Sequence, residues 1–220
     1  MFLFLKSTSR TVHHCREQPE EDNKIICTAT TNEASSTSLT VWRKSLLLNC
    51  SGFTVINGSD GGLAYRVDNY TRRPDQIVLM DGSGNPIFTI LRRKKLGLLD
   101  NYWLIYEGEV HKYCKNTTKK PICCVRKNIS IFMQRKVNVL AYVYHGTSEK
   151  RHTHTVEGSY KHRSCKILDY SRRVLGEIKK KYVSIGGVSF GSEVFEIIVK
   201  LEFDSRFAMA IVLSLDQMFS

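Results

Sequence analysis

The sequence predicts an all-β domain in which about twelve antiparallel strands close into a barrel around one central helix near the carboxyl terminus. Three observations support this prediction: an apolar segment near the end of the chain, about a dozen short strand-like runs before it, and glycine-rich turns between the runs. A closed ring of this many strands has more interior than its own side chains can fill. A barrel therefore accommodates an apolar helix better than a two-sheet sandwich does.

The apolar segment follows Asp204 and Ser205, either of which can cap the amino terminus of a helix. Residues 207–215 are apolar at every position except Ser214, whose hydroxyl can bond to the carbonyl one turn earlier. A helix without a polar face must be enclosed, and this segment is about half the ~20 residues that cross a bilayer, so protein must enclose it. A buried strand through residues 211–213 is the alternative; the length and the acidic cap favour the helix.

The strand-like runs are rich in Val, Ile, Tyr and Phe and are separated by Gly, Asn and Asp, which is typical of strands and turns. The expected strands are residues 39–47, 53–57, 63–67, 76–80, 86–92, 95–98, 102–107, 122–128, 137–144, 152–157, 165–168, 174–184 and 193–202. Turns such as Gly58-Ser59-Asp60-Gly61-Gly62 and Gly82-Ser83-Gly84-Asn85 supply the positive φ angles that tight hairpins need. Successive strands are therefore expected to pair antiparallel, as a meander.

One hairpin plan occurs twice. Leu79-Met80-Asp81, a turn, an aliphatic strand and Arg92-Arg93 recur as Ile167-Leu168-Asp169, a turn, a second aliphatic strand and Lys180-Lys181. The matching offsets suggest an internal repeat, which predicts that both basic clusters lie at equivalent edges of the barrel. The alternative is that short hairpins resemble one another through composition alone.

The length of 220 residues suits one large domain. In residues 1–37 the apolar residues do not recur with helix or strand spacing, so this segment is expected to be a disordered tail. Residues 38–219 are then expected to form the barrel. The tail holds four Lys or Arg and five Asp or Glu, so the formal net charge of +12 comes from the rest of the chain. Such a charge favours an anionic partner: nucleic acid, acidic lipid or an acidic protein.

The seven cysteines include the adjacent pair Cys123-Cys124 but no C-x-x-C motif. This pattern fits neither a disulfide framework nor a zinc ribbon and predicts buried, reduced thiols. The apolar start of the chain stops at Lys6, too early for a signal peptide. We therefore expect a protein of the cytoplasm or nucleus, with the periphery of the plasma membrane as a further location, that is not secreted and uses no cofactor.

Two motifs resemble a catalytic site and a metal site, but neither is assigned a catalytic or metal-binding role. Gly187-Val188-Ser189-Phe190-Gly191 spells the G-x-S-x-G of esterases, but a strand pattern follows it where the esterase motif requires a helix, so a glycine-rich turn is the interpretation. His152 and His154 are expected on one side of a strand, with His162 and Cys165 following, yet the spacing matches no zinc pattern.

The candidate anion-binding or lipid-binding residues are the cations of the repeated hairpins: Arg92, Arg93, Lys94, Lys95, Lys179, Lys180 and Lys181. Considered one at a time, each basic run is interpreted as a solvent-exposed strand end or loop. Together they predict a surface for phosphoinositide headgroups or other anionic lipid, where each cation contributes about 1 kcal/mol. Specific DNA binding is not expected, because the one predicted helix is apolar and enclosed.

Several motifs, in order along the chain, resemble the plant LURP-one-related family. They are Thr40-Val41-Trp42-Arg43-Lys44, Gly52-Phe53-Thr54-Val55, Tyr65-Arg66-Val67-Asp68, Val78-Leu79-Met80-Asp81-Gly82-Ser83-Gly84, Gly158-Ser159-Tyr160 with Arg163-Ser164-Cys165, and Asp204-Ser205-Arg206-Phe207-Ala208. The resemblance covers roughly residues 38–219 and implies a tubby-C-like fold, a twelve-stranded barrel around a hydrophobic carboxy-terminal helix, shared with phospholipid scramblases and tubby-like proteins.

The same resemblance implies a non-enzymatic signalling or binding module associated with plant defence. The likeness in fold also suggests a relation to membrane-tethered transcription regulators. No motif aligns with the phosphoinositide-binding residues of tubby, so none is carried over. The alternatives are a scramblase-like membrane protein and a protein-interaction scaffold that engages a signalling protein without binding lipid.

Overall fold

The computed structural model describes residues 36–69, 75–94, 101–110, 119–129, 138–147, 151–182 and 191–219. The expected strand at residues 95–98 and residues 1–35 of the expected tail lie outside these ranges. The first strand begins at Ser36, so the last two residues assigned to the tail belong to the barrel instead.

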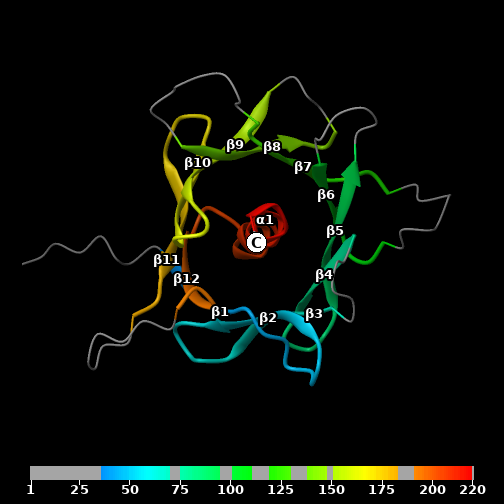
Figure 1. Cartoon of the computed structure of the whole chain (residues 1–220), viewed down its shortest axis with the longest axis vertical. Helices are drawn as coiled ribbons and strands as arrows, with labels where there is room; N and C mark the ends of the chain where they lie inside the picture. Colours follow the sequence, from blue (N-terminus) through cyan, green and yellow to red (C-terminus); the bar gives the residue numbers. More distant parts are fainter. Residues whose placement is uncertain are drawn as a thin grey trace, which may run out of the picture. The chain divides into compact units, whose positions relative to one another are not determined.

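Twelve antiparallel strands close into one barrel, as predicted (Figure 1). Each strand pairs with the next along the chain, and the last pairs with the first to close the ring. The strands are β1 (Ser36–Trp42), β2 (Ser51–Asn57), β3 (Leu63–Asn69), β4 (Gln76–Asp81), β5 (Pro86–Lys94), β6 (Asn101–Glu107), β7 (Cys123–Lys127), β8 (Val139–His145), β9 (His152–Ser159), β10 (Ser164–Asp169), β11 (Val174–Lys180) and β12 (Val194–Lys200).

The helix α1 (Ser205–Phe219) lies inside this ring, where Figure 1 shows it end-on. The Asp204 carboxylate accepts a hydrogen bond of 2.8 Å from the amide of Arg206, which makes Asp204 the cap of the helix. Ser214 donates to the carbonyl of Ala210 at 3.0 Å. The helix prediction is confirmed, and the strand alternative is wrong.

The ring and the helix share one core. Side chains of a strand alternate between its two faces, so every second side chain of each strand points inward, toward the helix. In β12, the side chains of Phe195, Ile197 and Val199 are fully buried and meet the helix side chains in a single apolar cluster, whereas Glu196 and Ile198 between them are half-buried. We call this cluster the inner core. Residues 208–216 of α1 are all buried, so the whole circumference of the helix is covered by protein.

A second, smaller apolar cluster covers the outer face of β5, β6 and β7. It consists of Leu91, Leu104, Tyr106, Val110 and Cys124. The adjacent cysteines therefore separate, since Cys123 lies in the inner core and Cys124 in the outer cluster. Cys123, Cys124 and Cys165 are buried and lie outside any disulfide, so the predicted burial is confirmed for these three; Cys50, also outside any disulfide, is only half-buried.

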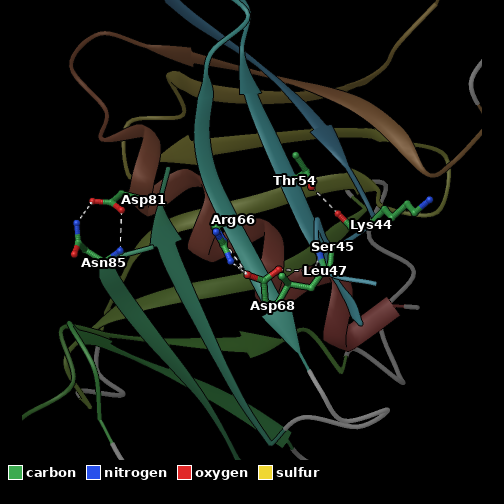
Figure 2. A network of polar contacts seen from close by, with 8 residues as sticks. All are labelled: Lys44, Ser45, Leu47, Thr54, Arg66, Asp68, Asp81 and Asn85. Carbon is green, nitrogen blue, oxygen red and sulfur yellow. Dashed lines mark hydrogen bonds and ion pairs between the residues drawn. The ribbon is translucent and has the colours of Figure 1, made fainter. Parts of the chain in front are cut away.

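The predicted strand at residues 39–47 is wrong in its second half, since β1 ends at Trp42. Ser45 accepts a hydrogen bond of 3.0 Å from the amide of Leu47 and donates one to Asp68 (Figure 2). These bonds fold the chain into a turn, because a serine side chain can replace the ladder partners of the backbone. Asn49 follows with a φ of 62°, which also ends the extended conformation.

The hairpin of β4 and β5 turns on Asp81. Its amide donates to the carbonyl of Asn85 at 3.0 Å, and its Oδ1 accepts from the amide of Asn85 at 2.8 Å (Figure 2). Gly84 has a φ of 93° and donates its amide to the Asp81 carbonyl at 3.0 Å. The ladder of the hairpin shifts register between Leu79 and Met80.

The hairpin of β10 and β11 repeats every one of these features. Asp169 donates its amide to the carbonyl of Arg173 at 3.0 Å and accepts from the Arg173 amide at 2.9 Å. Arg172 has a φ of 67° and donates to the Asp169 carbonyl at 3.1 Å, and the register shifts between Ile167 and Leu168. The shared bonding and the shared bulge support the internal repeat over a likeness of composition.

Candidate anion-binding site

The repeat brings the predicted basic clusters to one end of the barrel. In an antiparallel ring, strands of odd number run in one direction, so β1, β5, β7 and β11 all finish at the same end. Lys127, the last residue of β7, donates to the carbonyl of Met218 at 3.3 Å, so α1 finishes there too. We call this the basic end. β5 and β11 lie six strands apart in the ring of twelve, on opposite sides of it.

Arg92 and Lys180 occupy equivalent positions in the two hairpins and face the mouth of the barrel. Arg92 is opposite Trp103 and Lys180 is opposite Phe195, and both aromatic partners belong to the inner core. Residues opposite one another on neighbouring strands point to the same face. Arg92 is half-buried and Lys180 is exposed.

The other predicted cations lie beside these two. Arg93 is opposite Tyr102, which packs against the outer cluster, so Arg93 faces outward; Lys94 is exposed at the strand end. Lys179 lies 2.5 Å from Glu177, and this hydrogen bond from Lys179 lowers the pKa of Glu177. Lys181 donates to the Thr40 hydroxyl at 2.6 Å. Lys95 lies outside the described residues.

A cavity of about 310 Å³ opens at the basic end beside Arg92. Its lining comprises Arg92, Trp103, Lys127, Asn128, Ile129, Gln217 and Met218. We call it the Trp103 pocket. Two cations and no carboxylate are present among these lining residues, so the pocket favours a negatively charged occupant.

Two hydrogen-bond donors of this lining are buried and lack a protein partner. Arg92 Nε and Trp103 Nε1 both have no acceptor within the part of the chain that the structure describes. The guanidinium carbon of Arg92 lies 5.9 Å from the centroid of the Trp103 ring, so the two side chains are neighbours. A buried donor left unsatisfied costs about 1–3 kcal/mol. An acceptor-rich ligand in the pocket would recover this cost.

Lys127 and Asn128 complete the polar wall. The ammonium of Lys127 has three donors, of which the Met218 carbonyl takes one, and it also lies 4.6 Å from the centroid of the Phe219 ring. Asn128 Nδ2 donates to the carbonyl of Val139 at 3.1 Å. The charge of Lys127 therefore lies at the carboxyl end of α1, where the helix dipole stabilises it. Lys127 also lines the pocket.

Of the residues that line this pocket, the sequence analysis named Arg92 as an anion-binding candidate. It did not name Trp103, Lys127 or Asn128. Their strands are separate along the chain, and only the register of β5 with β6 and of β6 with β7 places them together. The available signal was a tryptophan at the start of a strand that follows the Arg92 hairpin; it does not by itself identify a pocket.

Of the two motifs left unassigned by the sequence, only the histidine motif can be placed, and neither His152 nor His154 lines the Trp103 pocket. Ser189 lies outside the described residues. His152 and His154 do not share a face as expected: His154 is opposite Val143 of the inner core, whereas His152 is opposite Tyr144 beside the outer cluster. A register shift between Val143 and Tyr144 separates them, because an extra residue in a ladder reverses the alternation.

His154 instead packs on aromatic rings, 5.4 Å from the centroid of Phe203 and 6.0 Å from that of Phe207. Burial lowers the pKa of His154. Across the described ranges, no group of three or more His, Cys, Asp or Glu side chains is arranged to hold a metal ion. Nor does any helix in the described part of the chain have the length and apolar character to cross a bilayer.

Comparison with known proteins gives consistent matches over the barrel. A family model described as LURP-one-related matches residues 37–216. The chain is similar to Protein LURP-one-related 17 of Arabidopsis thaliana, with 44% identity over 223 residues that cover 100% of both chains. It is also similar to Protein LURP-one-related 8 of the same plant, with 50% identity over 184 residues, or 82% of this chain and 86% of the relative.

The fold has a counterpart among solved structures. An X-ray structure of a protein from Arabidopsis thaliana superposes with a TM-score of 0.57 and covers 84% of this chain and 91% of that one. The two sequences are 20% identical, so the comparison establishes a shared fold only.

Proposed function

The chain belongs to the LURP-one-related family, and on that premise we propose that its barrel is a non-enzymatic module that binds phosphoinositide headgroups or other anionic lipid at the basic end. One observation carries this proposal. Arg92 Nε and Trp103 Nε1 are buried donors without an acceptor among the described residues, and both belong to the lining of one cationic pocket. Phosphate oxygens supply several acceptors and negative charge together, which is what this lining lacks.

The volume and position of the pocket agree with such a ligand. About 310 Å³ lies at the lower end of the range for small-molecule sites, so a headgroup fits better than a whole lipid. Lys94 and Lys180 are exposed on opposite sides of the same end and would contact the surrounding anionic surface. Binding of this kind suits a defence-signalling protein that moves between the membrane periphery and the cytoplasm or nucleus as lipid composition changes.

Vesicle co-sedimentation tests the proposal. The wild-type protein should sediment with phosphatidylcholine vesicles that contain a phosphatidylinositol phosphate, and not with phosphatidylcholine alone. Raised salt should weaken the binding, because exposed charges are screened. Arg92→Gln and Trp103→Phe should each reduce sedimentation, the second by removing one N–H donor while keeping an aromatic ring.

Lys200→Gln is the matched control. Lys200 is an exposed cation at the end of β12, which runs opposite to β5, so it lies at the other end of the barrel. This variant removes one positive charge, as Arg92→Gln does, and should sediment like the wild type. Equal losses in both variants would leave only general electrostatic attraction, and no loss in either would contradict the pocket.

The alternatives give different results in the same experiments. A protein scaffold without lipid binding would not sediment with any vesicle. A scramblase would transfer fluorescent lipid between leaflets, which requires α1 to leave the inner core although its residues 208–216 are buried there. We also propose that no hydrolase activity is present; an esterase activity that is lost in Ser189→Ala would contradict this.

A further inference from the structure

The loop between β1 and β2 exposes three consecutive leucines. Leu46 is 50% exposed, Leu47 36% and Leu48 92%, and Trp42 before them is 42% exposed. Single apolar residues on a surface are ordinary, but four exposed large apolar side chains within seven positions are an unusual concentration, of the kind that marks an interaction site. We call residues 46–48 the leucine tip.

The leucine tip is held in place by buried polar contacts at its base (Figure 2). Ser45 is 5% exposed and joins the amide of Leu47 to the carboxylate of Asp68. Arg66 Nε donates to the other oxygen of Asp68 at 2.7 Å, and the Thr54 hydroxyl donates to the Lys44 carbonyl at 2.7 Å. Because these hydrogen bonds hold the base of the loop, the leucines are exposed to solvent and do not pack back onto the barrel.

This tip lies at the basic end, because β1 is an odd-numbered strand and the loop follows it. Lys44 is exposed beside it, with Nζ 5.3 Å from the centroid of the Trp42 ring. Two further exposed apolar side chains occupy the same end, Ile129 after β7 at 44% and Tyr182 after β11 at 63%. The end thus combines protruding apolar groups with surrounding cations.

We propose that the leucine tip inserts into the boundary between headgroups and acyl chains of an anionic membrane when the basic end docks on it. The proposal rests on the proposed function and adds a second, apolar contribution to it. Charge complementarity selects this occupant: exposed cations at Lys44, Lys94 and Lys180 share the basic end with the apolar groups, a combination typical of surfaces that lie in the membrane interface. The pocket would recognise a headgroup, while the tip would anchor the barrel to the bilayer.

A triple variant tests the contribution of the tip to binding. Leu46→Ser, Leu47→Ser and Leu48→Ser together change only exposed side chains and leave the Ser45 base intact. Because burying a leucine side chain is strongly favourable, the triple variant should bind vesicles that contain a phosphatidylinositol phosphate at least about tenfold more weakly. Its remaining binding should be more sensitive to salt than that of the wild type. Wild-type affinity in the triple variant would overturn the proposal.

Fluorescence gives a readout of insertion itself. Leu48→Trp should be quenched by lipids brominated on their acyl chains, beyond the quenching seen for the two native tryptophans. Leu201→Trp is the matched control, since Leu201 is 66% exposed just after β12, at the opposite end of the barrel. Vesicle-bound Leu48→Trp protein that shows no added quenching would overturn insertion.

The outcomes separate this proposal from the proposed function. If Arg92→Gln weakens binding but the triple variant does not, headgroup binding stands and the leucine tip fails. If the wild type binds none of these vesicles, both proposals fail. If the wild type is a dimer in size-exclusion chromatography with light scattering and the triple variant is a monomer, a second copy of the chain covers the tip and the membrane proposal is overturned.

Discussion

The hydroxyl of Tyr160 donates a 3.1 Å hydrogen bond to Oδ1 of Asp216, which joins the end of β9 to the last turns of α1. Both residues are nearly inaccessible, at 2% and 3% exposure. Arg43 Nε lies 3.2 Å from the same carboxylate oxygen, and the guanidinium of Arg163 lies 4.3 Å from the centroid of the Tyr160 ring. The one carboxylate in the buried part of the helix is thus compensated by a hydroxyl and a cation.

Removal of this hydroxyl should destabilise the barrel. Tyr160→Phe leaves the buried carboxylate of Asp216 with one donor fewer, so we expect the free energy of unfolding to fall by about 1–3 kcal/mol. Urea denaturation measures the change. Tyr182→Phe is the control, since Tyr182 is 63% exposed and its substitution should be nearly neutral. Equal stability of Tyr160→Phe and the wild type would contradict the role assigned to the bond.

The helix side chains should dominate the stability of the fold. Ile211 is fully buried in the inner core, so Ile211→Ala should lower the free energy of unfolding by about 2–5 kcal/mol through lost burial and the cavity left behind. Leu201→Ala, at a side chain that is 66% exposed, should change it by less than about 0.5 kcal/mol. Similar losses for the two variants would show that α1 does not fill the barrel in solution.

The two repeated turns should make stability fall in acid. Hydrogen bonds from Asn85 hold the pKa of Asp81 below its usual range; burial opposes the same effect at Asp169, but bonds from Arg173 outweigh it. A carboxyl whose pKa is lower in the folded state adds stability above its unfolded pKa, about 3.9, and that stability is lost as the pH falls through the folded value.

The double variant Asp81→Asn and Asp169→Asn tests this dependence, because an amide oxygen can still accept the turn hydrogen bonds but does not titrate. The wild-type free energy of unfolding should decrease between pH 7 and about pH 3 more steeply than that of the double variant. Chemical denaturation at a series of pH values gives both curves. Parallel curves would mean that these two carboxylates do not contribute to acid unfolding.

The buried thiols should be unreactive in the folded protein. Burial raises the pKa of Cys123, and burial, opposed by the charge of Arg163, raises the pKa of Cys165 to about 11. In a background with Cys15, Cys27 and Cys114 changed to Ser, iodoacetamide at neutral pH should modify the half-buried Cys50 first, because only a thiolate reacts.

Mass spectrometry of peptides from native and urea-unfolded samples follows each site. Cys123, Cys124 and Cys165 should be modified only after unfolding. Modification of Cys165 in the native state at the rate of Cys50 would contradict its placement in the inner core.

The sequence by itself determined the elements of this fold. Asp204 as a cap and the apolar residues 207–215, broken only by Ser214, predicted α1 and its enclosure. Apolar strand-like runs between glycine-rich turns predicted the meander. The matching offsets around Asp81 and Asp169 predicted the paired hairpins. All of these signals are local, because helix caps, turn bonds and side-chain alternation act between residues a few positions apart.

Only the tertiary structure decided which residues become neighbours. The register of β5 with β6 placed Arg92 beside Trp103, and closure of the ring set Lys180 across the mouth from it. A register shift at Thr153, between His152 and His154, sent the two histidines to different faces. The buried contacts of Ser45 turned a predicted strand into an exposed leucine tip. The sequence period determines that side chains alternate between the two faces of a strand. The register of neighbouring strands, however, depends on long-range packing. That register determines where the charged side chains and the buried donors without an acceptor come together.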